Sequence, residues 1–125
     1  MGFIDIEDAL QARLNEAGID ACAKPLPASF ACPHVTVDML NAWDENAAQA
    51  VYSVDLDCRA ETYDGAARLQ LDVANLVREL PGSELGGKPV YAVDSLRLQR
   101  AQPDLSHQNV IIATVSANLR VRVAD

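Results

Sequence analysis

Apolar residues recur every three to four positions near the start of the chain, which predicts an amphipathic helix from Asp5 to Ala17. Asp5 is the expected N-cap, and Gly18 supplies a residue that readily adopts the left-handed conformation at the C-terminal end. Acidic side chains in the first turn stabilise the helix, because they lie near the positive end of its dipole. One stripe of apolar residues defines the buried side: Phe3, Ile6, Leu10 and Leu14.

A second helix is predicted from Asp64 to Leu80, where the same spacing is stronger. The dipeptide Pro81-Gly82 ends it, and Thr62 and Asp64 are competing N-caps, a choice that leaves the buried face unchanged. The apolar stripe comprises Ala66, Leu69, Val73, Leu76, Val77 and Leu80.

Alternation of apolar and polar residues predicts four strands, which span Val35–Leu40, Val51–Cys58, Val90–Leu98 and Ile111–Val123. In the second strand, Asp55 and Asp57 face away from the apolar residues, which indicates a solvated or partner-facing side. In the third, Leu96 and Leu98 are expected on one face with Val90 and Ala92, a face that Asp94 would interrupt. The fourth alternates over thirteen residues, whereas strands usually have about 5 or 6. We therefore expect it to extend beyond its own domain.

Three segments are predicted to be irregular: Lys24–Pro33 with its three prolines, Asn41–Gln49, and Arg100–Asn109. Trp43, the only tryptophan, falls in the second of these loops and is expected to be buried. The order helix, strand, strand, helix, strand, strand predicts one α+β domain over residues 1–125, with a single antiparallel or mixed sheet and both helices on one face.

Composition agrees with one water-soluble domain. The chain has 125 residues, of which 50% are hydrophobic, enough for one core. No apolar run approaches the roughly 20 residues of a membrane span. The opening residues, 1–8, have three acids and no base, unlike a secretory signal, so synthesis in the cytoplasm is expected. The three cysteines are an odd number, which favours a reducing compartment over a disulfide framework.

The net charge of −8 argues against sequence-specific nucleic-acid binding, because nucleic-acid phosphates repel an acidic surface. The charge is distributed unevenly. Residues 1–62 contain eleven acids and three bases, whereas residues 63–125 contain seven of each. The asymmetry is compatible with simple solubility, or with an acidic face that meets a basic face of a neighbouring protein.

Short signatures of catalytic sites are absent from the sequence. A zinc site would need Cys22, Cys32, His34 and Cys58 together, yet no Cys-x-x-Cys spacing places them. His34 and His107 are interpreted as ordinary surface histidines. Asp55 and Asp57, about 7 Å apart along one strand face, could form an acid–base pair, but a solvated face is the preferred interpretation. We expect no catalytic, cofactor or metal site.

The segment Gly86-Gly87-Lys88-Pro89 lacks the preceding strand and following helix that a phosphate-binding loop requires. A turn is therefore expected at this position.

The layout resembles that of a known family. A short helix opening as Ile4-Asp5-Ile6-Glu7-Asp8-Ala9-Leu10 precedes a proline-marked Val-Thr-Val strand, the strand 51–58 leads into the helix 63–80, and the last strand ends with Leu119-Arg120-Val121-Arg122-Val123. Across nearly the whole chain this is similar to the tail-terminator or tail-completion (neck) proteins of long-tailed, lambda-like bacteriophages. The resemblance rests on layout and includes no invariant motif.

The resemblance implies a non-enzymatic phage or prophage structural protein, a minor tail protein that works in the virion neck after synthesis in the bacterial host. Such a protein forms a ring, usually of six subunits, on the head-proximal end of the tail tube. It stops tube polymerisation and offers a docking face to the head, so its partners are the tail-tube protein and head-connector proteins. No cofactor, membrane or sequence-specific nucleic acid is implied.

A ring of identical subunits needs two different contact patches on each chain. Asp55 and Asp57 occupy outward-facing positions of one alternating strand, and Arg120 and Arg122 occupy the matching positions of another. We therefore expect the two acids of one subunit to approach the two arginines of its neighbour.

Three alternatives remain at the level of sequence. A head-closure or connector protein of the neck would share this composition. A small-ligand-binding regulatory domain would enclose an apolar pocket between helices and sheet. An enzyme would use Asp55, Asp57 or His34 in a deep cleft with perturbed pKa values.

Overall fold

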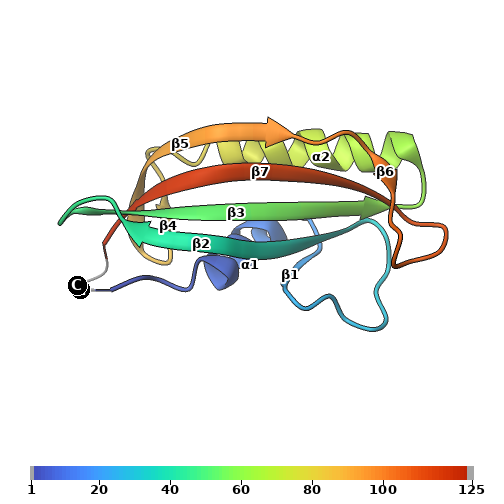
Figure 1. The fold of residues 1–125 in the computed structure, drawn as a ribbon, viewed down its shortest axis with the longest axis horizontal. Coiled ribbons are helices and arrows are strands. Elements are labelled where there is room, and N and C mark those ends of the chain that lie inside the picture. Colours follow the sequence, from blue (N-terminus) through green and yellow to red (C-terminus); the bar gives the residue numbers. More distant parts are fainter. Residues whose placement is uncertain (1, 124–125) are drawn as a thin grey trace.

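Two helices lie on one face of a curled sheet in the computed structural model of the protein, which describes residues 2–123 (Figure 1). Met1, Ala124 and Asp125, included in the predicted domain 1–125, lie outside the described residues. The elements in chain order are α1 (Ile6–Glu16), β1 (Ala21–Ala23), β2 (His34–Asp44), β3 (Gln49–Ala60), α2 (Tyr63–Arg78), β4 (Glu84–Leu85), β5 (Lys88–Leu98), β6 (Gln102–Pro103) and β7 (Ile111–Arg122).

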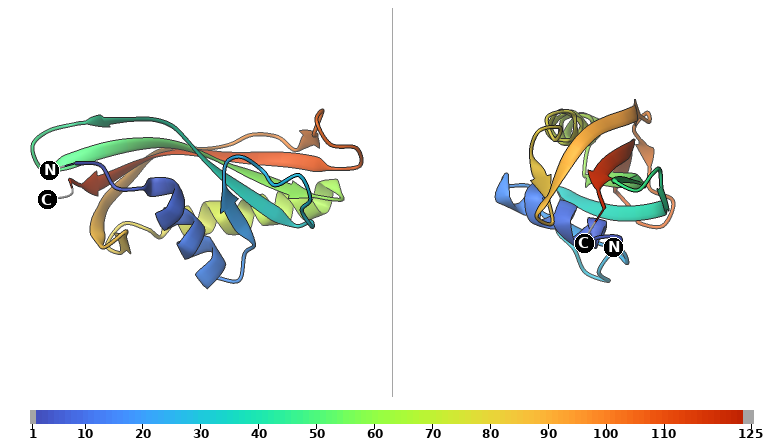
Figure 2. Two further views of the ribbon diagram at one scale, coloured as in Figure 1. Left: turned by 90° about the horizontal axis from the view of Figure 1, so that it is seen from below. Right: turned by 90° about the vertical axis from the view of Figure 1, so that its left-hand side faces the viewer.

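The sheet has the order β1-β2-β3-β7-β5-β4, with β6 paired to the end of β7. Its β1–β2 pair is parallel and its other pairs are antiparallel, so the sheet is mixed. Seen from the side and from the end, it twists and curls strongly while both helices stay on the same side (Figure 2). The predicted α+β class is confirmed, and the predicted order of helices and long strands holds, with three short strands added.

Both helices begin where side-chain caps predict. The Asp5 carboxylate accepts a hydrogen bond from the Asp8 N–H, and Gly18 follows α1 with a φ of 85°. Of the two candidate caps for α2, Thr62 is the one used, because its hydroxyl accepts the Gly65 N–H at 2.9 Å. Neither helix within residues 2–123 is long and apolar enough to cross a membrane.

The core lies between the two helices and one face of the sheet. Alternate residues of β3 and β7 fill it from the sheet, and the predicted apolar stripes fill it from the helices. Phe3 is the exception to the predicted stripe of α1, because it precedes the helix and is 51% exposed. The largest side chains that are fully buried include Ile6, Leu10, Leu14, Tyr52, Leu56, Leu80, Leu85 and Leu119.

The long last strand does not extend beyond the domain, so that prediction is wrong. β7 pairs with β3 from Ile111, opposite Ala60, to Arg122, opposite Gln49. β5 lies along its other side, which makes β7 a central strand. Its length is matched by a partner of the same length, since β3 and β7 have 12 residues each.

The predicted loop Asn41–Gln49 is also wrong for most of its length. β2 continues through Asp44, and the hairpin turn is confined to residues 45–48. The Asn46 side chain stabilises this short turn, because it accepts hydrogen bonds from the N–H groups of Ala48 and Gln49. Trp43, expected to be buried, is 38% exposed at the edge of the sheet.

Two register shifts in β5 correct the predicted faces of that strand. They lie between Val90 and Ala92 and between Asp94 and Arg97. Each shift changes which face the following residues occupy. Ala92 and Asp94 consequently lie opposite Arg120 and Asn118, away from the helices, while Val93 and Leu96 pack against the core.

Candidate assembly surface on the helix-free face of the sheet

All four predicted interface residues lie on the face of the sheet that no helix covers, hereafter the helix-free face. The register places Asp55 opposite Ser116 and Asp57 opposite Thr114, while Arg120 and Arg122 occupy the same face farther along β7. The four residue steps from Ser116 to Arg120 correspond to about 13 Å of strand. Within one chain, the two acids and the two arginines therefore lie towards opposite ends of this face.

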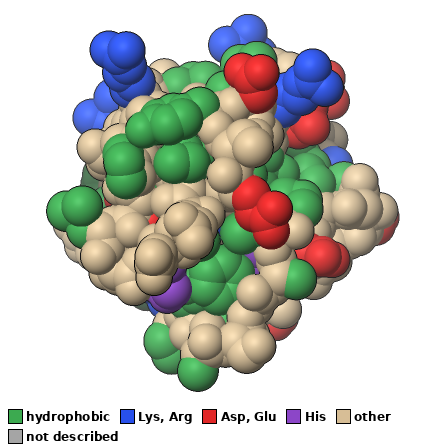
Figure 3. All heavy atoms as spheres, turned by 90° about the vertical axis from the view of Figure 1, so that its right-hand side faces the viewer, with side chains coloured by type: hydrophobic (Ala, Val, Ile, Leu, Met, Phe, Trp, Pro, Cys, Tyr) green, Lys and Arg blue, Asp and Glu red, His purple; other side chains and the backbone are tan. Residues whose placement is uncertain are grey.

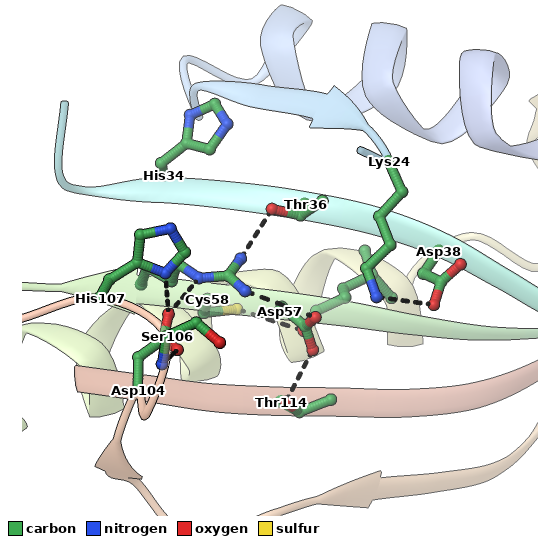
Figure 4. A network of polar contacts seen from close by, with 12 residues as sticks. Lys24, His34, Thr36, Asp38, Asp57, Cys58, Asp104, Ser106, His107 and Thr114 are labelled. Atoms are coloured by element: carbon green, nitrogen blue, oxygen red, sulfur yellow. Dashed lines mark hydrogen bonds and ion pairs between the residues drawn. The ribbon is translucent and has the colours of Figure 1, made fainter. Parts of the chain in front are cut away.

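The acidic end is organised around Arg59, at the end of β3. Its guanidinium donates to the Thr36 hydroxyl at 2.8 Å and to the Asp104 carboxylate at 2.9 Å (Figure 4). Asp57 lies 4.0 Å from the same group. We call Thr36, Asp57, Arg59 and Asp104 the Arg59 cluster. Arg59 is only 7% exposed, so its charge depends on these partners.

Asp104 shapes the loop between β6 and β7. Besides Arg59, its carboxylate accepts the Ser106 N–H and contacts Nδ1 of His107 at 2.9 Å. Burial raises the pKa of Asp104, but the hydrogen bonds from Arg59, Ser106 and His107 outweigh burial and hold it below its usual value. The loop is thus fixed to β3 by an ionised carboxylate.

The side chains of Asp55 and Asp57 are hydrogen-bonded within the sheet, whereas a solvated face was predicted for them. Asp57 has a 14% exposed side chain and accepts the Thr114 hydroxyl at 2.8 Å. Asp55 accepts the Ser116 hydroxyl at 2.6 Å. The alternation was predicted correctly, but β7 lies beside these acids and supplies hydroxyl donors. Each carboxylate keeps acceptor capacity for a further partner.

The opposite end of the face is organised around Arg120. Its Nε contacts Asp94 of β5, and Nη1 lies 3.2 Å from Glu45 in the hairpin turn. The Trp43 indole N–H donates to Glu45 at 3.3 Å. Arg120 thereby joins both sides of the sheet across β3 and β7 within one chain. Arg122, the last residue of β7, is exposed, and no side-chain hydrogen bond or ion pair involves it among the described residues.

The residues weighed as zinc ligands do not converge. Cys22 Sγ lies 3.2 Å from His34 Nε2, but Cys58 is on the helix side of β3, whereas His34 is on the helix-free face. Within residues 2–123, no three His, Cys, Asp or Glu side chains are placed to hold a metal ion. The Gly86-Gly87 segment forms the tight β4–β5 turn that was expected, with φ values of 57° and 79°.

The titratable groups lack the properties of a reactive site. Burial raises the pKa of Cys22 and of Cys32, and it raises that of Cys58 to about 12, so the thiols stay protonated. Burial lowers the pKa of His34. Asp104 orients His107, but no hydrogen bond joins the other ring nitrogen of His107 to a hydroxyl or thiol within residues 2–123.

Phe30 lies between the two histidines, with ring centroids 5.9 Å from His34 and 5.2 Å from His107. This end of the molecule shows histidine beside hydrophobic side chains in a shallow hollow (Figure 3). Sequence reasoning did not identify Arg59 or Asp104 as site residues. The signal available was Arg59 itself, which continues the Asp55 and Asp57 alternation; its partner is 45 residues away.

No protein-family model matches the chain, and no curated protein matches it. Its fold is similar to that of a chain in a solved structure described as "Virion of native gene transfer agent (GTA) particle". The TM-score is 0.51 and the sequence identity is 17%, over 94% of this chain and 91% of that chain. At this identity the likeness shows that the two chains share a fold.

Proposed function

We propose that the protein is a structural subunit of a phage-like virion, and that it caps the head-proximal end of the tail tube as a tail terminator. In this role it stops tube polymerisation and helps to join the tail to the head. The proposal rests mainly on the fold that the chain shares, over nearly its full length, with a chain of the gene transfer agent virion.

The helix-free face supports an assembly role better than a catalytic one. Its polar side chains are tied to one another, as in the Arg59 cluster, rather than directed into a deep cleft. Burial raises the pKa of Cys22 and lowers that of His34, and both shifts favour the neutral forms of these side chains. A reaction would need an activated nucleophile or a positioned acid–base pair. The alternatives of an enzyme and of a small-ligand-binding domain therefore gain no specific support.

The assembled form is proposed to be a ring of identical subunits, six in the form that the resemblance implies. One candidate contact between subunits is the predicted pairing of Asp55 and Asp57 with a neighbour's Arg120 and Arg122, which remains a prediction. Because Arg120 is already held by Asp94 and Glu45, Arg122 is the arginine available to a neighbour.

Tube-length measurement by electron microscopy tests this function. Purified tail-tube protein from the same phage-like gene cluster is polymerised with and without this chain. Short tubes with density at one end are expected in its presence, and long uncapped tubes in its absence. Unchanged tube lengths together with binding to head connectors would instead indicate a head-closure protein, and no binding to either would reject a neck role.

A further inference from the structure

The two outer edges of the sheet are mostly without strand partners. At one side, β1 pairs only with Val35–Val37 of β2, so Asp38–Asp44 have no strand on their outer side in the sheet formed by residues 2–123. At the other, β4 pairs only with Lys88 and Pro89, which leaves Tyr91–Leu98 of β5 uncovered among residues 2–123. Uncovered edges invite pairing with another chain unless they are blunted. We call these segments the β2 edge and the β5 edge.

The β2 edge combines exposed apolar side chains with acids. Met39 is 39% exposed, Leu40 55% and Trp43 38%, all within five residues of one strand. Asp44 and Asp38, the latter 3.2 Å from Lys24 of its own chain, belong to the same segment. By register, Met39 lies on the core-facing side of β2, opposite Val54, and Trp43 lies on the helix-free face, opposite Val51, so exposed apolar side chains flank this edge on both sides. Exposed apolar side chains with charged neighbours are typical of a protein contact surface. The acids assign a basic partner to this edge.

The β5 edge has the complementary character. Tyr91 and Leu98 are each 43% exposed. Arg97 is exposed on β5 and Arg100 just beyond it, and neither makes an ion pair within the described part of the chain. The uneven charge distribution of the sequence therefore corresponds to an acidic β2 edge and a β5 edge with unpaired arginines.

Strand direction allows the two edges to meet. The four long strands β2, β3, β7 and β5 are antiparallel to their neighbours in turn. Because four is an even number, β2 and β5 run in opposite directions, and β5 of one copy can lie antiparallel to β2 of the next. Following the registers across one chain, Asp38 is level with Asp55, Ser116 and Arg97, and Trp43 is level with Val51, Arg120 and Ala92.

From these features we infer that the β2 edge of one copy docks against the β5 edge of the next. Without stagger, Asp38 meets the neighbour's Arg97 at one end of the contact, and Trp43 meets the region of Tyr91 at the other. The contact is heterologous, as a ring requires, and the curl of the sheet provides the turn from copy to copy. The inference rests on the proposed function for the expectation that copies associate.

Side chains are expected to contribute more to this contact than main-chain hydrogen bonds. Leu40 and Tyr91 are bulge residues, left out of the pairing inside the chain, and bulges interrupt regular ladders. The Met39 N–H is already occupied by the Glu7 carboxylate at 2.8 Å. The exposed apolar side chains of the two edges and the charges beside them therefore determine which edges fit together.

Disulfide cross-linking tests the geometry directly. In a background with Cys22, Cys32 and Cys58 replaced, Leu40→Cys and Ser95→Cys are made separately and together; the registers put these positions at the same level. Mild oxidation, on tail tubes and in solution, is expected to give a covalent dimer when the two single variants are mixed. The double variant is expected to give a ladder of multiples. No cross-link in the mixture, or an equal cross-link within each single variant, would overturn the inference.

A charge swap provides the second readout. Arg97→Asp and Asp38→Arg are each expected to weaken association at least tenfold by analytical ultracentrifugation, and the combined variant is expected to recover most of it. Asp38 also pairs with Lys24 of its own chain at 3.2 Å, so circular dichroism checks the fold of each variant. The control is Arg68→Glu, an exposed arginine of α2 away from both edges. Failure of the combined variant to recover, with the fold intact, contradicts the proposed pair.

The tail-terminator role and the contact between sheet edges can be rejected independently of each other. Rings that cross-link through Leu40→Cys and Ser95→Cys but leave tube length unchanged support the edge contact and reject the tail-terminator role. Capped tubes whose subunits do not cross-link support the role and reject the edge contact.

Discussion

Arg59 and Asp104 lie 45 residues apart in the chain, yet Arg59 Nε is 2.9 Å from Asp104 Oδ2, and their side chains are only 9% and 7% exposed. This ion pair fixes the β6–β7 loop to the end of β3. The loop in turn presents Leu105, which is 99% exposed. A loop that displays an apolar side chain to water is thus held in place by one nearly buried ion pair.

Replacing Arg59 with Gln is expected to lower the free energy of unfolding by about 3 to 5 kcal/mol, because the variant leaves Asp104 nearly buried without its charge partner. Urea denaturation followed by circular dichroism measures the change. Lys24→Gln is the matched control, because the Lys24–Asp38 pair is 47% and 24% exposed and should contribute less than about 1 kcal/mol. Equal effects of the two substitutions would show that the Arg59 cluster does not stabilise the fold.

The Asp104 carboxylate is also expected to make the stability of the fold depend on pH in the acidic range. The hydrogen bonds to Asp104 hold its pKa in the folded state below the ordinary value of 3.8. Near that value the unfolded chain binds more protons than the folded one, so this contribution is complete above the unfolded pKa and is lost as pH falls through the folded pKa. The stability difference between the wild type and Asp104→Asn should therefore narrow as pH is lowered from about 5 to about 2. A constant difference across this range would contradict the assignment.

Tyr52 connects the start of the chain to the centre of the sheet. Its side chain is fully buried, and its hydroxyl oxygen accepts the Ile4 N–H at 2.9 Å. Tyr52→Phe keeps the ring but leaves that N–H without its partner, so a loss of about 1 to 2 kcal/mol in unfolding free energy is expected. Thermal denaturation and amide exchange at Ile4 measure it. Tyr91→Phe, at an exposed tyrosine, should change stability by less than about 0.5 kcal/mol.

The helices and the inner faces of β3 and β7 could be predicted because their signals are local. Asp5 and Thr62 are capping residues that the structure uses as caps, and the apolar period of each segment matches its buried side. Strand ends were harder. β2 continues to Asp44 because β3 pairs with it there, and that pairing depends on a turn formed by the Asn46 side chain.

The faces of β5 and the Arg59 cluster could not be predicted from local pattern. The bulges in β5 reverse which residues face the core, and alternation along one strand does not reveal the register against its neighbour. Arg59 and Asp104 are adjacent only because the β6–β7 loop folds back onto β3. The sequence pattern paired Arg120 with a neighbouring subunit because its partners within the chain, Asp94 of β5 and Glu45 of the β2–β3 turn, come from segments whose positions were unknown.

Arg122 and Arg97 can be compared directly, because both are exposed arginines without an ion pair in the described chain. If the edges of the sheet form the subunit contact, Arg97→Glu should weaken self-association at least tenfold, and Arg122→Glu should change it less than threefold. The reverse order would favour the pairing of Asp55 and Asp57 with Arg122 across the helix-free faces. Sedimentation at two salt concentrations measures both variants. The effect of the contacting arginine should shrink at high salt, because screening weakens exposed charge pairs. Arg120→Glu is unsuitable for this comparison, since it would also break the contacts with Asp94 and Glu45 inside the chain.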